Sequence, residues 1–386
     1  MKLYYVVNAR MPNEKAHGIQ IAKMCEAFAE VGADITLIVP TRDGSARDLQ
    51  SFYSLRQNIP LIRLWVPDFY TFGRIGFFVS SVFFMLRYVL FLLRKRIMGE
   101  DFFIYTIDMD TFSFAFLPLL GACSAEMHTP KKGTMLQKFF FNRVHSVVST
   151  NSLTKMALVQ TFAFPQERII VEPNGVDTKM FISLPSRDEA RRKLLLPLTE
   201  KIALYVGRLY AWKGLEILPA AGERLLAEDI ECYVVGGTAD EFEKLSGQKL
   251  PKNLHCMGIK GVEEIPLWLA ASDVALVVGT AHNIDSFRYT SPMKLFEYVA
   301  ARVPIVASGT PALKDVLTEN EVLFYEPDNA GSLARRIVSA VEDFHESAIR
   351  VEQAFQKVQQ HTWQKRAERV LAFCSPLREN TLHATR

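Results

Sequence analysis

A lysine close to a predicted helix start is the clearest sign of chemistry in this 386-residue sequence. Ser291 is a favourable N-cap and Pro292 is favoured at the first helical position, so we expect a helix from here to about Ala301. The first turn of a helix usually carries an acid, but this one carries Lys294. Free backbone N–H groups beside a cation bind anions. The alternative is a surface ion pair between Lys294 and Glu297.

Two further cations follow a predicted strand that ends at Gly207. Arg208 and Lys213 are expected at the carboxyl end of that strand, with Lys213 opening the next helix. Arginine grips phosphate oxygens with its planar guanidinium, and lysine does so as a point charge. The segment is not a P-loop, because Trp212 precedes the lysine and Gly214 follows it. Two solvated loop cations are the alternative interpretation.

A histidine occupies a similar position in the first half of the chain, where His128 follows a predicted strand at 122–126. A histidine at the carboxyl end of a strand can act as an acid, a base or a hydrogen-bond donor. The alternative is a loop histidine packed against the sheet. His17 is a weaker candidate of the same kind. No G-x-G-x-x-G motif occurs in the sequence, so a nicotinamide- or flavin-dependent oxidoreductase is not indicated.

Short β-rich runs alternate with helix-like stretches along the chain, which predicts an α/β protein with two doubly wound parallel sheets. The expected strands cover residues 2–7, 34–39, 60–65, 102–106, 122–126, 145–148 and 168–171 in the first half, and 201–206, 231–236, 254–257, 273–278, 303–306 and 321–324 in the second. The turn-forming Pro-Asn-Gly near residue 173 predicts domains at 1–172 and 173–362. Residues 363–386 are expected to form a C-terminal helix and tail that can cross back to the N-terminal domain.

The composition excludes several classes of protein. The chain carries 45 Lys+Arg against 42 Asp+Glu, too close to neutral for a protein whose main partner is a nucleic acid. Its five cysteines are widely spaced and form no C-x-x-C, which favours a reducing cytosol over a disulfide framework or zinc site. The short apolar run at the N-terminus is typical of a first buried strand rather than a signal peptide.

One apolar segment stands apart, at residues 75–93, with three basic residues following at 94–96. Its length is close to the ~20 residues that a membrane span needs. Ser80, Arg87 and Arg94 recur every seventh residue, which predicts one narrow polar stripe along a helix. Residues 1–170 also carry 19 basic and 13 acidic side chains, so an anionic surface is the expected partner of this half. An interfacial helix, a buried or partner-facing helix and a true span are the three alternatives.

Taken in order and spacing, six motifs resemble those of the retaining glycosyltransferases of family 4, which use nucleotide-sugar donors. The motifs are N-A-R-M-P-N-E-K-A-H-G-I-Q (8–20), A-E-M-H (125–128), E-P-N-G-V-D (172–177), Y-V-G-R-L with W-K-G (205–214), A-S-D-V (271–274) and S-P-M-K-L-F-E-Y-V-A with P-I-V-A-S (291–308). The resemblance covers nearly the whole chain. It implies the GT-B architecture, in which two Rossmann-like domains face a central cleft.

The resemblance also implies roles for individual residues. Arg208 and Lys213 would neutralise the donor diphosphate as the glycosidic bond breaks, and His128 would lie beside the transferred sugar. These three are the predicted catalytic residues. Glu297 matches the second glutamate of the family's E-x7-E motif, which accepts hydrogen bonds from the ribose. The other predicted donor-binding residues are Gly18, Ile259, Tyr289, Thr290, Ser291, Met293 and Lys294.

The chain departs from the family pattern at Tyr289, which stands where the first glutamate of E-x7-E is expected. That glutamate touches the donor sugar in the family, so the departure concerns sugar identity rather than nucleotide binding. Asp285 is an alternative source of the carboxylate.

The resemblance implies an enzyme that transfers a sugar, with retention, from a UDP or GDP sugar to a glycan or lipid-linked acceptor in cell-surface polysaccharide or glycolipid synthesis. No metal or other cofactor is expected, and Asp108-Met109-Asp110 is the only formal match to a D-x-D metal motif. We expect a cytoplasmic protein, peripheral on the cytoplasmic membrane face, in contact with anionic lipid. The alternatives are a sugar-nucleotide epimerase of the same fold and a catalytically silent subunit that binds donor and supports a partner.

Overall fold

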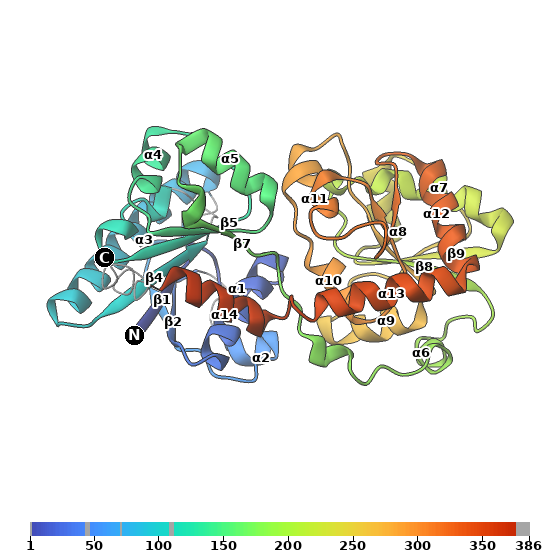
Figure 1. The fold of residues 1–386 in the computed structure, drawn as a ribbon, viewed down its shortest axis with the longest axis horizontal. Coiled ribbons are helices and arrows are strands. Elements are labelled where there is room, and N and C mark those ends of the chain that lie inside the picture. The colour runs from blue at the N-terminus through green and yellow to red at the C-terminus, as the bar shows by residue number, and fades with distance from the viewer. Residues whose placement is uncertain (1, 43–46, 70–71, 108–111, 376–386) are drawn as a thin grey trace. The chain divides into compact units, whose positions relative to one another are not determined.

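The chain forms two α/β domains in a computed structural model that describes residues 2–42, 47–69, 72–107 and 112–375. The first domain comprises Met1–Pro173 together with Trp363–Arg386, and the second comprises Asn174–Thr362. The second domain is therefore an insertion into the first. Figure 1 shows the C-terminal helix α14 (Trp363–Cys374), in red, beside α1 (Ala16–Glu30), in blue.

The first domain is built on a seven-stranded parallel sheet in the order β3-β2-β1-β4-β5-β6-β7. Its strands are β1 (Lys2–Val6), β2 (Asp34–Pro40), β3 (Leu61–Leu64), β4 (Phe102–Ile107), β5 (Cys123–Met127), β6 (Ser146–Ser149) and β7 (Ile169–Val171). Tyr4 of β1 is opposite Thr36 of β2 and Ile104 of β4. Tyr4 and Tyr5 point to opposite faces and are both buried, because helices cover both faces of the sheet.

In the described part of the first domain, four further α-helices lie between successive strands of the chain. They are α2 (Leu49–Tyr53), α3 (Gly73–Ile97), α4 (Met135–Phe141) and α5 (Ser152–Phe162), with two short 3-10 turns, Phe112–Phe114 and Leu117–Leu119, before β5. Phe84 of α3 and Phe140 of α4 pack with Tyr4 on one face of the sheet. On the other face, Phe28 of α1 contacts Tyr105 with ring centroids 5.4 Å apart.

Helix α3 comprises the apolar segment. The prediction that Ser80, Arg87 and Arg94 share one polar stripe is wrong for Ser80. Ser80 is buried and donates a 2.7 Å hydrogen bond to the carbonyl of Pro67, whereas Arg87 and Arg94 are exposed. The reason is geometric: the buried stripe follows i, i+4 spacing, which rotates about 40° per step around the helix and leaves the seven-residue line after Ser80. The buried residues of α3 are Gly76, Ser80, Ser81, Phe84, Tyr88 and Leu92.

The second domain has a six-stranded parallel sheet in the order β10-β9-β8-β11-β12-β13. Its strands are β8 (Lys201–Val206), β9 (Ile230–Val235), β10 (Leu254–Cys256), β11 (Val274–Val277), β12 (Ile305–Ser308) and β13 (Leu323–Tyr325). The chain winds outward in one direction from β8 and in the other from β11, so the carboxyl ends of these two strands form a topological switch point. Ligands of open α/β sheets bind at such points.

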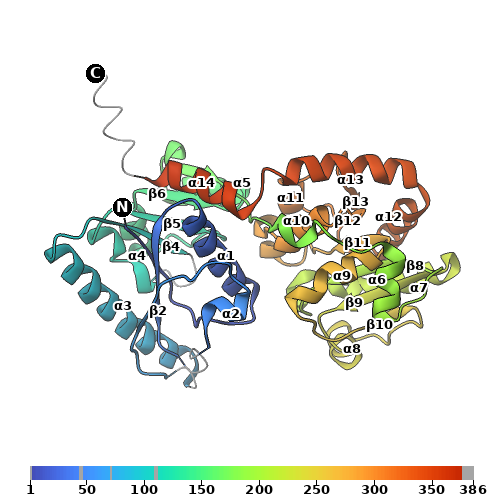
Figure 2. The same ribbon diagram turned by 90° about the horizontal axis from the view of Figure 1, so that it is seen from below.

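The helices of the second domain cover both faces of its sheet (Figure 2). They are α6 (Arg187–Leu194), α7 (Leu218–Leu225), α8 (Ala239–Ser246), α9 (Ile265–Ala271), α10 (Met293–Ala300), α11 (Pro311–Lys314), α12 (Ala330–Glu342) and α13 (Phe344–Val358). The predicted α/β class with two parallel-sheet domains is confirmed. The predicted strands are all present, although β12 and β13 begin two residues later than their sequence patterns suggest.

Candidate functional site

Lys213 lies just beyond the carboxyl end of β8, in a conformation that the sequence did not predict. It ends a short 3-10 turn, Ala211–Lys213, and the next α-helix begins only at Leu218. The prediction that Lys213 opens a helix is wrong because Gly214 follows with a φ of 76°, which breaks the helical path. A Cβ on Gly214 would lie 2.7 Å from Cβ of Thr280, so glycine lets this turn approach the loop after β11.

The ammonium group of Lys213 is held by the turn itself. Its Nζ donates a 3.1 Å hydrogen bond to the carbonyl of Arg208 and lies 5.0 Å from the ring centroid of Tyr210. Burial lowers the pKa of Lys213 to about 8. No described carboxylate pairs with it, so its charge is available to an anionic ligand.

Helix α10 begins at Met293, and the predicted cap is wrong. Pro292 occupies the N-cap position and no side chain caps the helix. The Ser291 hydroxyl instead accepts a 3.4 Å hydrogen bond from the backbone N–H of Asn174, whose amide donates to the carbonyl of Ser291 at 2.6 Å. This tertiary contact draws Ser291 away from the helix, which leaves the first-turn N–H groups without a side-chain acceptor.

Lys294 is the most unusual cation of this region. Its Nζ is buried and has no hydrogen-bond partner among the described residues. It lies 3.9 Å from the ring centroid of Tyr205, so the cation is held over an aromatic face. Burial, and then the nearby charge of Lys213, hold the pKa of Lys294 well below its ordinary value. The alternative interpretation, a surface ion pair with Glu297, is not what the structure contains.

Glu297 is one turn further along α10. Burial raises the pKa of its carboxyl to about 7, and Lys294 opposes that shift only in part. Lys213, Lys294 and Glu297 are therefore three neighbouring ionisable groups with displaced pKa values, at the carboxyl end of the parallel sheet. Such a group is typical of functional sites, because structural charges are normally paired.

Four other predicted residues surround this group. Tyr289 ends a single π-helical turn, Asp285–Tyr289, and the N–H of Thr290 donates to the carbonyl of Asp285 at 2.9 Å. This turn packs against the Ala211–Lys213 turn. Met293 is the first residue of α10, as given above. Asp285, the alternative carboxylate, is exposed at the start of the π turn.

Two predicted residues of the second domain are exposed. The Arg208 guanidinium makes no hydrogen bond or ion pair with the described part of the chain, so it is open to a ligand. Ile259 is 56% exposed in the loop after β10. That loop is tied to the end of β9, because the N–H of Gly258 donates to the carbonyl of Gly237 at 3.0 Å.

His128 lies in the first domain, directly after β5. Its Nε2 is 2.8 Å from Oε1 of Glu126, and its side chain is 29% exposed. Because Glu126 accepts the proton of Nε2, the other ring nitrogen, Nδ1, is left for other partners. His17 is nearby, and its buried Nε2 has no hydrogen-bond partner among the described residues. Burial, and then His128, lower the pKa of His17 to about 3.

The carboxylate behind His128 is fully buried and well satisfied. Glu126 accepts hydrogen bonds from Gln20 at 2.8 Å, from Tyr105 at 2.7 Å and from two nitrogens of Arg366 at 2.8 and 3.2 Å. Burial opposes its ionisation, but Arg366 and then His128 outweigh this and hold the pKa of Glu126 well below its usual range. Arg366 lies on α14, so this C-terminal helix stabilises the residue that orients His128.

The predicted role of Gly18 has a competing structural explanation. Gly18 lies in the first turn of α1, where an added Cβ would be 2.4 Å from the Tyr53 hydroxyl and 2.7 Å from the Asn13 amide. Packing within the first domain is therefore sufficient to require glycine. A role in approaching the donor phosphates remains a prediction.

Sequence reasoning missed Asn174, Glu126 and Arg366 as positioning residues. A carboxylate inside an otherwise apolar strand was the one available signal for Glu126, because buried charges need partners. Asn174 belongs to a quoted motif, but its contact with Ser291 joins residues more than a hundred positions apart. Arg366 carried no local signal.

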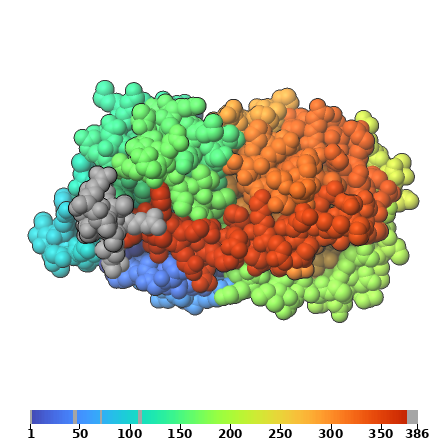
Figure 3. All heavy atoms as spheres, in the orientation of Figure 1, coloured from blue at the N-terminus to red at the C-terminus, as the bar shows by residue number. Residues whose placement is uncertain are grey.

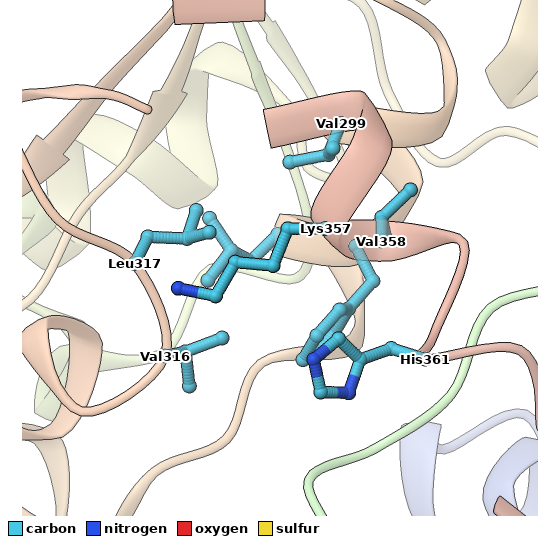
Figure 4. Close-up of a pocket in the computed structure, with 8 residues that line it drawn as sticks. Val299, Val316, Leu317, Lys357, Val358 and His361 are labelled. Carbon is cyan, nitrogen blue, oxygen red and sulfur yellow. The ribbon is translucent and has the colours of Figure 1, made fainter. Parts of the chain in front are cut away.

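Neither a metal-ligand cluster nor the apolar pocket coincides with these residues in the described part of the chain. Within the described ranges, no group of three or more His, Cys, Asp or Glu side chains is placed to hold a metal ion. Asp108-Met109-Asp110 lies outside the described residues. A small apolar pocket between α10 and α13 is lined by Val299, Val358 and His361 among others (Figure 4), and none of the predicted site residues lines it.

Part of the chain is similar to a known family and to several curated proteins. Residues 186–357 match the family described as glycosyl transferases group 1. The chain is 24% identical over 230 residues to the D-inositol 3-phosphate glycosyltransferase of Corynebacterium aurimucosum, a match that covers 56% of this chain and 53% of that protein. It is 30% identical over 163 residues to the putative colanic acid biosynthesis glycosyl transferase WcaI of Escherichia coli, covering 41% and 39%. The chain thus spans about half or less of the length of these relatives.

Solved structures share the fold over the whole chain. The sucrose-phosphate synthase of Thermosynechococcus elongatus superposes with a TM-score of 0.76 at 18% identity and covers 100% of both chains. Anabaena HepE, solved in complex with UDP and glucose, gives a TM-score of 0.70 at 17% identity over 97% of this chain and 99% of its own. At these identities the similarity concerns the fold, and it confirms the two-domain GT-B architecture.

Proposed function

Because its residues 186–357 match the family of group 1 glycosyl transferases, we propose that the protein transfers a sugar from a UDP or GDP donor to a glycan or lipid-linked acceptor, with retention at the anomeric carbon. The observation that supports this most is the cation group at the switch point of the second domain. Among the residues that the structure describes, no carboxylate is hydrogen-bonded to Lys213 or Lys294, and both lie beside the uncapped start of α10. A diphosphate supplies the negative charge that such a group lacks.

In the proposed mechanism, the second domain holds the donor and stabilises its leaving group. Lys213, Lys294 and the exposed Arg208 offset the charge that grows on the diphosphate as the glycosidic bond breaks, and the free N–H groups of α10 bind its oxygens. These cations do what Mg²⁺ does in other phosphate sites, so no metal is required. Glu297 accepts hydrogen bonds from the ribose hydroxyls. Ile259 contacts the nucleotide base of the donor.

In the same mechanism, the first domain contributes His128 beside the transferred sugar. Its Nε2 is committed to Glu126, so Nδ1 is the ring nitrogen available to a sugar hydroxyl. Strand β5 fixes the backbone of His128, and the buried carboxylate of Glu126 fixes its ring. Both contacts favour a precise position of the imidazole against the sugar. Gly18 retains its predicted place near the phosphates as part of this proposal.

The names of similar proteins support the donor and the pathway separately. The HepE structure holds UDP and glucose, which supports a nucleotide-sugar donor, and WcaI is named for colanic acid biosynthesis, which supports a polysaccharide pathway. The D-inositol 3-phosphate glycosyltransferase is named for a small acceptor instead. We therefore place the reaction in cell-surface polysaccharide or glycolipid synthesis. We also propose that the protein works in the cytoplasm, peripherally on the cytoplasmic face of the membrane.

The direct test pairs donor binding with turnover. We expect the melting temperature to rise with a UDP or GDP sugar, because a ligand of the folded state stabilises it. We further expect transfer to a polyprenyl-linked glycan to continue in EDTA, with an NMR coupling constant that shows the donor's anomeric configuration retained. Loss of activity in EDTA would contradict the metal-free mechanism. Donor interconversion without acceptor would indicate an epimerase, and binding without turnover a silent subunit.

Donor affinity is expected to depend on pH through Glu297 and Lys213. Glu297, with a pKa of about 7, accepts hydrogen bonds better when ionised, so affinity should rise as the pH rises through this value. Lys213, with a pKa of about 8, binds diphosphate when protonated, so affinity should fall as the pH rises further. Lys294 acts in the same direction as Lys213, because its pKa is also lowered.

Calorimetric titration of a nucleotide sugar between pH 5.5 and 9.5 measures this profile, with a change of up to about tenfold per pH unit on each limb. A nucleotide sugar is preferred to UDP because its diphosphate does not titrate in this range. In Glu297→Gln the acid limb should vanish while the alkaline limb remains. An acid limb that survives in this variant would remove Glu297 from the ribose contact.

A further inference from the structure

Helix α3 exposes an apolar surface that the described residues of its domain leave largely uncovered, although Phe78 stacks on Phe112. The exposed fraction is 78% for Ile75, 56% for Phe78, 52% for Leu86, 65% for Leu90 and 85% for Ile97. At about 100° per residue these side chains, with Leu93, fall on one side of the helix, opposite the buried stripe. We call this set, Ile75, Phe78, Leu86, Leu90, Leu93 and Ile97, the α3 outer face. Figure 2 shows α3 at the rim of the first domain, and Figure 3 shows it in cyan at the edge of the molecule.

Basic side chains flank the α3 outer face. Residues 73–97 carry five positive charges and no acid: Arg74, Arg87, Arg94, Lys95 and Arg96. By the same helical geometry, Arg87 and Arg94 lie along one flank of the outer face, and Arg74 and Arg96 along the other. The arrangement, an apolar stripe between two cationic flanks, is typical of helices that lie in a membrane interface.

Exposed aromatic rings extend this surface beyond the helix. Trp65 is 57% exposed, and the guanidinium carbon of Arg87 lies 5.7 Å from the centroid of its ring. Phe72, at the start of α3, is 73% exposed. Tryptophan and other aromatic side chains concentrate at the level of lipid headgroups, where one end of the ring is wet and the other is apolar.

The helix cannot serve as a span while the domain is folded. By length and composition it qualifies, with 25 residues and a mean hydropathy of 2.0, but a third of its apolar window is buried within the domain. Its inner side is tied down by polar contacts. Ser80 donates to the carbonyl of Pro67, and the amide of Asn8 donates to the Ser81 hydroxyl at 2.9 Å. Extracting α3 would break these bonds and expose the core around Phe84 and Tyr88.

We propose that the α3 outer face docks the first domain on an anionic lipid bilayer, with the helix axis in the membrane plane. The apolar side chains enter the acyl boundary while the flanking arginines contact lipid phosphates. Charge decides between this occupant and a second copy of the chain. Pairing the face with itself would bring together two sets of five positive charges, of which Lys95 is paired with Glu100 just after the helix, whereas anionic headgroups complement the flanking arginines. Docking adds the lipid bilayer as a partner to the proposed function. It depends on that function only in one point, that the acceptor is lipid-linked.

Co-sedimentation of the full-length protein with vesicles of 30% phosphatidylglycerol in phosphatidylcholine tests the proposal. We expect Leu86→Gln/Leu90→Gln to lower the partition coefficient at least tenfold. The matched control is Ile182→Gln/Leu195→Gln, which removes two even more exposed apolar side chains, 76% and 92%, from the second domain and should leave binding unchanged. Arg87→Gln/Arg94→Gln should weaken binding to anionic vesicles severalfold, and salt should do the same.

Three results would overturn the proposal. The natural protein could fail to sediment with anionic vesicles, the leucine variant could bind as well as the natural protein, or ultracentrifugation could show a dimer that only the leucine variant disrupts. The last result would assign the α3 outer face to a second copy. The rise in melting temperature with nucleotide sugar is measured on the same variants and should not change. Failure of docking is therefore distinguishable from failure of the transferase assignment.

Discussion

Replacing Lys213 by methionine is expected to lower kcat/KM roughly 10²–10³-fold, which is the usual cost of removing one preorganised group that stabilises developing charge. Methionine keeps much of the side-chain volume and the contact with Tyr210, so the loss reports the charge. We expect the effect mainly in kcat, because the charge on the leaving diphosphate grows as the glycosidic bond breaks. Steady-state kinetics with saturating acceptor measures it.

The control for this variant is Lys252→Met, an exposed lysine of the same domain that no predicted role involves. It should leave both kinetic constants within about twofold, since isolated surface charges contribute little. An unchanged rate in Lys213→Met would remove the diphosphate clamp from the mechanism. A rise in KM with kcat unchanged would instead assign Lys213 to uniform binding of the donor.

The second large effect is expected for the buried ion pair that joins α14 to the first domain. Arg366→Met should destabilise that domain by about 3–5 kcal/mol, because Glu126 would remain as an uncompensated charge in the core. The pair is fully buried on both sides. Urea unfolding, with hydrogen exchange to assign the transition to the first domain, measures the loss.

Two further variants separate charge burial from packing. Glu126→Gln/Arg366→Met removes both charges and should recover much of the lost stability, because no unpaired ion remains. Arg369→Met breaks a neighbouring pair in which the arginine is 37% exposed and the Glu172 carboxylate is buried, and it should cost less than Arg366→Met because this pair reaches solvent on one side. A double variant as unstable as Arg366→Met alone would show that the guanidinium matters for packing rather than for charge.

The fold was largely predictable because it depends on local patterns. Each strand is a short apolar run followed by a turn, and the strand-helix alternation of a parallel sheet is visible in the sequence. The second-domain cations were also predictable, since Arg208, Lys213 and Lys294 follow strands or open a helix. Their chemistry required only their position at strand ends.

What the sequence did not predict depends on tertiary contacts. Ser291 is an excellent cap by type, but Asn174 binds it instead and the helix begins two residues later. Ser80 belongs to a polar line by spacing, but the domain buries it against Pro67. Glu126 and Arg366 are 240 positions apart, and no local pattern relates residues at that distance.

The division of the first domain between the two ends of the chain has a consequence for its synthesis. Residues 174–362 are contiguous, so the second domain has every partner it needs once they leave the ribosome. The N-terminal portion emerges earlier, yet Glu126 can meet Arg366 only after the whole second domain has been made. The usual vectorial order is therefore reversed, and the half that is made first is the last to mature.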